Sequence, residues 1–474
     1  MSGRTRNSLR TATPPWLAAL FGAPDKKFLS QADCEALVAQ AEQYAQGGGE
    51  TRCTVTSWWS GELRWARNRA SLASDRRNDE LGVGRRIQGA EGGVRTNQID
   101  AASLQGAVQA AERNAHYGET NPDDHREPPP RFDYLTPAIW SDPTFAQPAG
   151  ERARAAQAII APAEQAGMLS FGFLAVQAAG HAVIDPAVGR PLYAPYTAAQ
   201  CSLTVRDPEG TGSGWAGASS CDWTRIDPAA LARRALEKCL ASRHPVTIEP
   251  GRYTVILEPQ AVHALVRPVV GDFYGRLDAE RSTDGPFHLR PFYSKLGLQV
   301  ADSRVTIAQD PLDPDLGVIP FTDDGQPVRP VTWIDRGMLT HLAYWSNYAL
   351  EWLHDNDPIV NRWGYRMAGG SATVEDMIRS TQRGLLVTRF SNLDMLDPQS
   401  LLMTGVTRDG LWLIEHGTIS KAVKNLRFTE SPLFVLNSIE MLGPPERVFS
   451  PDSPAIVPPL KAHDFSFTST IDAI

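Results

Sequence analysis

Histidine and carboxylate side chains of this chain could bind a metal ion. The spacing of these residues in the sequence, however, argues against a metal site. Ten histidines occur among the 474 residues. None is separated from another as in H-x-x-H, H-x-x-x-H or H-E-x-x-H, the spacings that bring two imidazoles onto one face of a helix. Glu258 and His263 lie five residues apart. We expect His263 to be at the surface or hydrogen-bonded, with a metal role as the minor alternative.

Five aspartates gather in two neighbouring loops of the C-terminal half: Asp310, Asp313, Asp315, Asp323 and Asp324. Carboxylates are the ligands that calcium prefers, but these loops lack the spaced ligands and the terminal glutamate of an EF-hand. We therefore expect solvated turns and keep a calcium site as the alternative.

Residues 212–217, Gly-Ser-Gly-Trp-Ala-Gly, fit the dinucleotide pattern G-x-G-x-x-G literally. That fingerprint must open a helix, so that backbone N–H groups meet the pyrophosphate. Here the helical pattern begins only after Asp227, and we predict a glycine-rich hairpin instead. Ser213 is not part of a G-x-S-x-G nucleophile elbow, so no serine nucleophile is predicted. The remaining polar cluster, Thr407-Arg408-Asp409-Gly410, is interpreted as a turn with an Arg–Asp pair.

Composition excludes several classes of protein. The chain is 42% hydrophobic and 21% charged, which is typical of a soluble globular protein. Its net charge of −8 argues against nucleic acid as a partner, and no apolar run is long enough to predict a membrane span. The five cysteines are scattered and form no C-x-x-C, which favours free thiols and a cytoplasmic location.

The elements needed to position these residues form an α+β pattern. We predict a flexible lead (1–27), an N-terminal α/β domain (28–117), a Pro-rich linker (118–150), a central α/β domain (151–244) and a C-terminal β-rich domain (245–474). Each α/β domain reads as helix, strand meander, helix, with Ser30, Ser103 and Asp227 as expected N-caps. The C-terminal domain is expected to be antiparallel and barrel-like, because short strands alternate with polar turns.

Several segments resemble the TldD/PmbA family, and their order matches it over nearly the whole chain after residue 28. They are VRTNQIDAASLQGAVQAAERNA (94–115), GTGSGWAGASSCDWTRID (210–227), PGRYTVILEP (250–259), FTDDGQPVRPVTWIDRGMLTHLAYWSNYA (321–349) and TGVTRDGLWLIEHGTISKAVKNLRFTESPLFVL (404–436). The last is the most specific, because it resembles the family's glycine turn, aromatic strand, Ile-Glu-x-Gly and pairing strand. In the fourth, Asp324 stands where the family usually has Glu.

Catalytic members of this family carry His-Glu-x-x-x-His just after an apolar strand. In register on Leu265, Val266 and Gly271, the first His position holds Arg267, the Glu position Pro268 and the last His position Asp272. The resemblance also implies a further zinc ligand from a C-terminal cysteine, and no cysteine follows Cys239 here. We therefore predict no metal site and no cofactor in this chain.

The resemblance implies a heteromer in which a zinc-bearing TldD-type subunit pairs with a TldE/PmbA-type subunit that lacks the motif, and the two enclose and cut unfolded or modified peptides. We expect this chain to be the non-catalytic subunit, with Arg408 and Asp409 as candidates for lining the peptide channel. Zinc is expected in the TldD-type partner. One alternative is a stand-alone peptide-binding or scaffold homodimer. Another is an enzyme with a new site near Glu258, His263 and Asp272.

Overall fold

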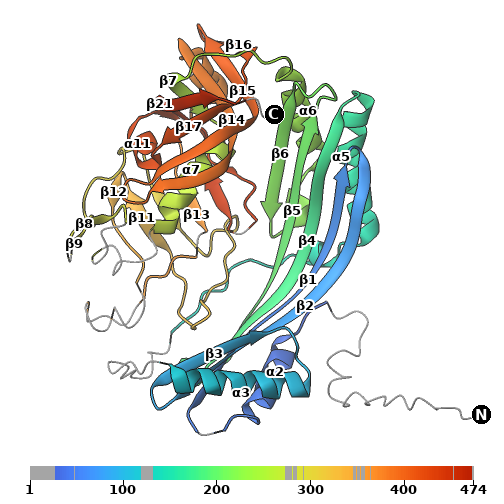
Figure 1. Cartoon of the computed structure of the whole chain (residues 1–474), viewed down its shortest axis with the longest axis vertical. Coiled ribbons are helices and arrows are strands. Elements are labelled where there is room, and N and C mark those ends of the chain that lie inside the picture. The colour runs from blue at the N-terminus through green and yellow to red at the C-terminus, as the bar shows by residue number, and fades with distance from the viewer. Residues whose placement is uncertain are drawn as a thin grey trace, which may run out of the picture. The chain divides into compact units, whose positions relative to one another are not determined.

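The computed structural model describes residues 27–46, 48–118, 132–272, 280, 285–291, 293–344, 349, 353, 358–362, 364–451 and 453–471 (Figure 1). Residues 1–26 of the predicted lead and 119–131 of the predicted linker lie outside them. Contacts divide the chain into two compact units: unit 1 comprises Met1–Trp59, Arg77–His125 and Ala178–Ala194, and unit 2 comprises Ser60–Arg76, Arg126–Gln177 and Pro195–Ile474. The domain boundaries expected from the sequence stay predictions.

The two predicted meanders form one six-stranded sheet with the order β3-β2-β1-β4-β5-β6. Its strands are β1 (Glu50–Ala66), β2 (Arg69–Ile87), β3 (Ala90–Thr96), β4 (Leu169–Ile184), β5 (Leu192–Arg206) and β6 (Ser213–Ser220). Along β1 and β5 buried and half-buried side chains alternate, because successive residues of a strand point to opposite faces. The last pair of strands is an antiparallel hairpin in which Arg206 faces Ser213.

Unit 1 holds the helices α2 (Gln31–Glu42) and α3 (Ala101–Tyr117) and the short 3-10 helix η1 (Pro186–Val188). Ser30 caps α2, as predicted, and it forms a capping box with Asp33. The prediction of Ser103 as the cap of α3 is wrong. Asp100 caps this helix, because its carboxylate accepts from the backbone N–H of Ala102 and Ser103, and it also accepts from the Ser103 hydroxyl. A carboxylate three residues upstream therefore displaces the hydroxyl from the capping role.

Unit 2 contains the helices that flank the second meander: α4 (Asp142–Ala146), α5 (Ala149–Gln165), the 3-10 helix η2 (Trp223–Arg225) and α6 (Pro228–Ala241). Asp227 caps α6 and Pro228 is its first residue, as predicted. Helix α6 lies directly against β6: a Cβ added at Gly214 would come 2.1 Å from the carbonyl oxygen of Ala235. Glycine in this strand thus permits the close approach of helix and strand.

A five-stranded barrel forms the larger part of the C-terminal region, and the α+β fold class with a barrel is confirmed. The closed path runs β14-β7-β21-β17-β15 and returns to β14. Its strands are β7 (Gly251–Leu257), β14 (Arg383–Asp397), β15 (Leu402–Glu415), β17 (Leu426–Glu430) and β21 (Leu460–Thr470). A ring with an odd number of strands cannot alternate direction throughout, and the required parallel pair is β7 with β14. The other four pairs of the ring are antiparallel.

Shorter elements surround the barrel. The strands β16 (Thr418–Ala422) and β18 (Ile439–Leu442) extend the sheet of the barrel. The same region of the chain contains the short helices α10 (Val374–Arg379) and α11 (Pro432–Asn437). A second sheet has the order β12-β11-β10-β13-β20-β19, made of Met338–Leu339, Val331–Asp335, Ile307–Gln309, Tyr365–Met367, Ala455–Val457 and Glu446–Arg447. A separate hairpin pairs β8 (His288–Arg290) with β9 (Tyr293–Ser294).

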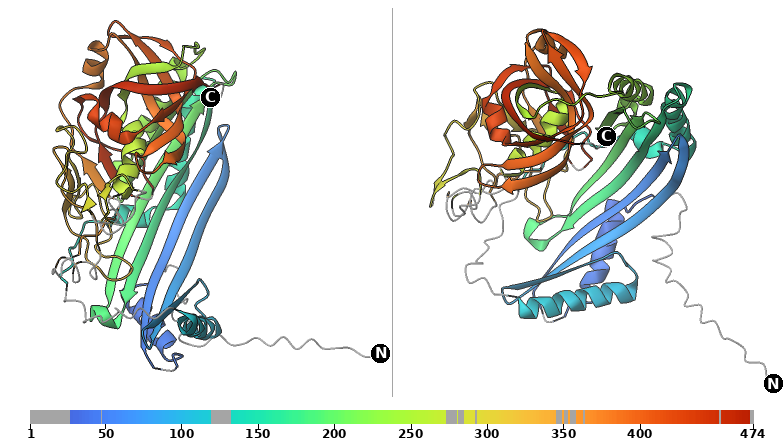
Figure 2. Two further views of the ribbon diagram at one scale, coloured as in Figure 1. Left: turned by 60° about the vertical axis from the view of Figure 1, so that its left-hand side comes forward. Right: turned by 45° about the horizontal axis from the view of Figure 1, so that its top comes forward.

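Helix α7 (Pro259–Asp272) follows β7 directly. Figure 2 shows it in yellow-green beside the orange and red strands of the barrel. Its buried residues recur at helical spacing and join the barrel core: Ala261, Val262, Leu265, Val266, Val269 and Val270. No helix in the described part of the chain has the length and apolar character needed to cross a membrane.

Candidate functional site

The segment aligned with His-Glu-x-x-x-His folds as the second half of α7. Because its apolar stripe faces the core, Arg267 and Pro268 turn away from it, and Arg267 is exposed while Pro268 is half-buried. Pro268 has no N–H to donate to the carbonyl of Ala264 one turn earlier. Asp272 is the last residue of the helix, and its side chain lies outside the described residues.

These residues do not fit zinc. Arginine stays protonated and offers no lone pair, and proline supplies neither a ligand nor the base that would activate a water molecule. Within the described ranges, no group of three His, Cys, Asp or Glu side chains is arranged to hold a metal ion.

His263, one turn before Arg267, is buried and hydrogen-bonded. Its Nδ1 lies 2.8 Å from the hydroxyl oxygen of Tyr365, and the two rings stack with centroids 5.9 Å apart. Burial, and secondly the positive charge of Arg267, lower the pKa of His263 to about 4. The imidazole is therefore neutral at pH 7 and serves as a hydrogen-bonding partner in the core.

The alternative enzyme site near Glu258, His263 and Asp272 cannot form around one ligand. Glu258 precedes α7 and Asp272 ends it, so their backbones lie about 21 Å apart at 1.5 Å per residue. The carboxylate of Glu258 accepts a hydrogen bond from Lys238 of α6. Burial lowers the pKa of Lys238, and the charge of Glu258 opposes that shift.

Two aspartates of the first acidic loop, Asp313 and Asp315, form ion pairs with arginine side chains. Asp313 accepts two hydrogen bonds from Arg366, at 2.8 and 2.6 Å. Asp315 pairs with Arg225 and Arg447, and these contacts lower its pKa against the effect of burial. The oxygens of these two carboxylates face guanidinium groups, which argues against the calcium alternative at Asp313 and Asp315.

The segment Thr407–Gly410 lies inside β15, so the prediction of a turn there is wrong. Val387 faces Leu411 and Arg389 faces Arg408, which leaves Thr388 of β14 opposite two residues, Asp409 and Gly410. This is a β-bulge. Asp409 has φ +55° and Gly410 has φ +128°, both in the left-handed region. The bulge re-aims the Asp409 side chain.

Asp409 is 1% exposed, and charged and polar partners surround its carboxylate. Arg389 donates to Oδ2 through two nitrogens, with Nε at 2.7 Å. The Ser213 hydroxyl donates to Oδ1, and Arg408 Nε lies 3.9 Å from Oδ2. The guanidinium of Arg389 also lies over the Trp215 ring, 5.0 Å from its centre. The Arg–Asp pair expected from the sequence exists, but its closer member is Arg389.

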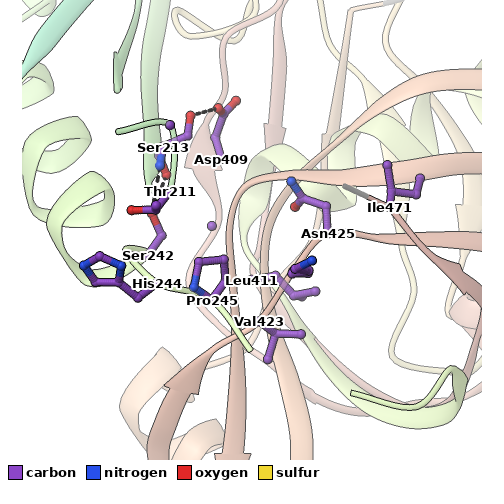
Figure 3. A pocket seen from close by; sticks show the side chains of 13 residues that line it. Thr211, Ser213, Ser242, His244, Pro245, Asp409, Leu411, Val423, Asn425 and Ile471 are labelled. Carbon is purple, nitrogen blue, oxygen red and sulfur yellow. Dashed lines mark hydrogen bonds between the residues drawn. The ribbon is translucent and has the colours of Figure 1, made fainter. Parts of the chain in front are cut away.

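A pocket of about 340 Å³ opens beside this carboxylate, entirely within unit 2 (Figure 3). Its lining residues come from the β5–β6 turn, the end of α6, the bulge of β15, the β16–β17 connection and the end of β21. They are Gly210, Thr211, Ser213, Ser242, His244, Pro245, Asp409, Gly410, Leu411, Val423, Lys424, Asn425 and Ile471.

Three hydrogen bonds fix the polar wall of the pocket. The Ser242 hydroxyl accepts from the Ser213 N–H at 3.0 Å and donates to the Ser213 carbonyl at 2.8 Å, so one side chain satisfies both backbone groups at the edge of β6. Thr407 donates to Asn425 Oδ1 at 3.1 Å. Asn425 thus lines the pocket.

The sequence predicted Asp409 as a candidate site residue, but it did not predict the residues that contact the Asp409 carboxylate. Ser213 lies 196 residues away in the sequence, and nothing in the sequence links the two. A usable signal was the Asp-Gly dipeptide inside an otherwise regular strand pattern, which is typical of a bulge.

Comparison with known proteins agrees with this fold. Residues 250–469 match the family model of the PmbA/TldA metallopeptidase C-terminal domain. TldE from Thermococcus kodakarensis is 17% identical over 92% of this chain and 100% of its own, with a TM-score of 0.78. A candidate modulator of DNA gyrase from Bacteroides thetaiotaomicron is 17% identical over 92% and 99%, with a TM-score of 0.78. Another, from Thermotoga maritima, is 16% identical over 92% and 99%, with a TM-score of 0.76.

Identities this low show a shared fold alone, and none of the curated proteins matches the chain in sequence. The barrel and α7 thus define a PmbA/TldA-type C-terminal domain. The resemblance to the TldD/PmbA family is thus supported by the family-model match over residues 250–469 and by a fold shared over most of the chain.

Proposed function

We propose that this chain is the non-catalytic, TldE-type subunit of a heteromeric zinc peptidase and that it binds extended peptide beside the catalytic subunit. The observation that carries the proposal is the second half of α7. Arg267 and Pro268 occupy the positions of the first ligand and the catalytic base, and neither side chain can do that chemistry. The fold shared with a TldE supports the same assignment.

The proposal gives zinc and the reacting water to a TldD-type partner with an intact His-Glu-x-x-x-His. This chain contributes a wall of the peptide chamber, with Arg408 and Asp409 among its lining residues. The proposed compartment is the cytoplasm, which the scattered and odd set of cysteines favours.

The first test is the zinc content of the purified chain after extensive dialysis. We expect negligible zinc by elemental analysis. About one zinc per chain would overturn the proposal, because it would require ligands outside the aligned motif.

The second test is assembly. The chain is expressed alone and together with a protein from the same genome that carries the intact motif, and molar mass is measured by light scattering. We expect a heteromer that cuts unfolded peptides. Activity should be lost when the partner's motif glutamate is changed and should persist in the variant Arg267→Ala of this chain. A homodimer unchanged by the partner would favour the stand-alone binding or scaffold protein.

A further inference from the structure

One edge of β2, the one that faces away from β1, is open along Arg69–Arg76. The strand lies between β1 and β3 in the sheet, but β3 pairs only with Leu81–Ile87 of β2. Within the described ranges, no other strand pairs with this open edge. Seven of its eight side chains are exposed, and Ser74 is half-buried. Along roughly 27 Å, at 3.4 Å per residue, the backbone is therefore available to a further strand.

The open edge has few of the features that keep strand edges apart. Proteins protect such edges with proline, with lysine, by keeping the strand very short, or by covering it. The sequence of the open edge, RASLASDR, contains neither proline nor lysine, and the strand is long. At the opposite border of the sheet, β6 is mostly buried. The sheet can therefore gain a strand at β2 and not at β6.

The charges on one face of the open edge lie too far apart to pair within one chain. Arg69 is exposed and forms no ion pair with any described residue. Asp75 is on the same face, with half of its side chain exposed, and it uses Oδ1 for Arg152 of α5, which leaves Oδ2. Six residues separate Arg69 from Asp75, which is about 20 Å along the strand. On the other face, Arg76 is already paired with Glu62 at 2.8 Å.

A two-fold axis at Leu72 brings the separated charges together. In an antiparallel pair centred on this residue, Arg69 of one copy lies opposite Asp75 of the other, and the symmetry repeats the pair. The two Leu72 side chains meet at the axis, and each is 41% exposed in the single chain. Opposite charges and apolar side chains that face each other across an antiparallel pair stabilise it.

Neighbouring registers are less favourable. A two-fold axis perpendicular to the sheet keeps the faces of both strands aligned, so it must pass through a residue. With the axis one residue after Leu72, Arg69 lies opposite Arg77, and like charges in that arrangement are destabilising. With the axis two residues after Leu72, Arg69 lies opposite Asp79, which is buried and already accepts from Ser57. With the axis one residue earlier, the overlap is shorter and Arg69 has no opposite charge.

We propose that the open edge of β2 pairs with the open edge of a second copy of this chain, antiparallel and with the two-fold axis at Leu72. The β1–β2 hairpins of the two copies then form one sheet. An extended peptide would use the same backbone groups, but the two Arg69–Asp75 pairs form only between two copies. This inference goes beyond the proposed function, because it assigns a surface for self-association in which α7 has no part.

The register is tested by disulfide formation under mild oxidation. Because adjacent antiparallel pairs alternate between a wider and a closer spacing, two designs are needed: Leu72→Cys alone, and an equal mixture of Ser71→Cys with Ala73→Cys. At least one should give a crosslinked dimer. Ala70→Cys alone is the control, since its two thiols would lie about 14 Å apart along the pair. All variants carry Cys221→Ser, because the other native cysteines are buried.

The strength of association is tested by sedimentation velocity on the full chain. The wild type should sediment with twice the 51.8 kDa mass of one chain. Arg69→Asp should raise the dissociation constant about tenfold, because attraction becomes repulsion at both symmetry-related positions. Arg233→Asp makes the same charge change on the exposed surface of α6 and should leave the dissociation constant unchanged. Circular dichroism checks the fold of both variants.

A chain that stays monomeric up to about 0.1 mM would overturn the proposal. So would a dimer in which neither cysteine design crosslinks, one in which Ala70→Cys crosslinks as fast, or one whose dissociation constant is the same in Arg69→Asp. None of these results depends on a catalytic partner. A monomer that binds the subunit with the intact motif would reject only this proposal, and a crosslinked homodimer that does not bind it would reject only the TldE-type role.

Discussion

Acidification should destabilise this protein through His263, and Arg267 should increase the effect. The imidazole is buried against Tyr365 with its pKa lowered to about 4, whereas in the unfolded chain it is near 6.5. Between these two values the unfolded state binds more protons than the folded state. The contribution of His263 to stability is therefore fully present above pH 6.5 and is lost as the pH falls towards 4.

The magnitude follows from the difference between the two pKa values. A shift of about 2.5 units corresponds to about 3 kcal/mol at 1.36 kcal/mol per unit. Most of this loss should be visible between pH 7 and pH 4.5. Because burial is the larger cause and Arg267 the smaller one, Arg267→Gln should reduce the pH dependence of unfolding without removing it.

The assay is urea unfolding followed by tryptophan fluorescence at pH 7 and pH 4.5. It is applied to the wild type, Arg267→Gln and His263→Gln, the last of which keeps a polar group near Tyr365. Arg233→Gln, on the exposed surface of α6, controls for the loss of one positive charge. Between pH 7 and pH 4.5, His263→Gln should lose about 2.4 kcal/mol less than the wild type. Equal losses in these two proteins, or an imidazole pKa near 6.5 by NMR titration, would refute the reasoning.

Two further substitutions probe the wall of the pocket. Asp409→Asn preserves shape but leaves Arg389 without its counter-charge, and we expect the free energy of unfolding in urea to fall by about 3 kcal/mol. Asp335→Asn, at a half-buried residue whose only close cation among the described residues is Arg336 at 3.8 Å, is the control and should change stability by less than about 0.5 kcal/mol. Ser242→Ala removes the hydroxyl that bonds both backbone groups of Ser213, and we expect a loss of about 1–2 kcal/mol, measured as a lower midpoint of thermal unfolding. Ser71→Ala, on an exposed part of β2, is its control and should leave that midpoint unchanged.

Local signals predicted local structure well. The N-cap at Ser30, the Asp227-Pro228 start of α6 and the strand before α7 all rest on side chains within a few residues of the backbone they act on. The Ser103 error is also local: two capping residues lie three positions apart, and the hydrogen bonds decide between them.

The site depends on contacts that sequence spacing does not encode. Asp409 meets Ser213 and Arg389 because β15 carries a bulge and because β6 lies beside the barrel. The barrel could be expected from the strand pattern. The pocket could not, since its lining comes from five separate segments of the chain. The loss of the metal motif stays a prediction, and it rests on the difference in chemistry between Arg267 and Pro268 and the His and Glu of the aligned positions.

Gly410 lies in the bulge that positions Asp409, a candidate for lining the peptide channel. Gly410→Ala should therefore reduce both the stability of the fold and peptide binding. The residue has φ +128°, which an alanine rarely adopts. A Cβ here would lie 2.2 Å from the Trp412 ring and 2.8 Å from the Thr388 hydroxyl. We expect the free energy of unfolding to fall by about 3 kcal/mol or more and the binding of extended peptide to weaken, because the bulge must shift and takes Asp409 with it.

Gly106→Ala is the matched control for this substitution. Gly106 lies inside α3, and nothing comes within 4 Å of an added Cβ. Since alanine is the better helix former by about 1 kcal/mol, this variant should unfold at higher urea concentration and bind peptide as the wild type does. If Gly410→Ala matched the wild type in both stability and peptide binding, the bulge would not be what positions Asp409. The pocket would then need another explanation for its geometry.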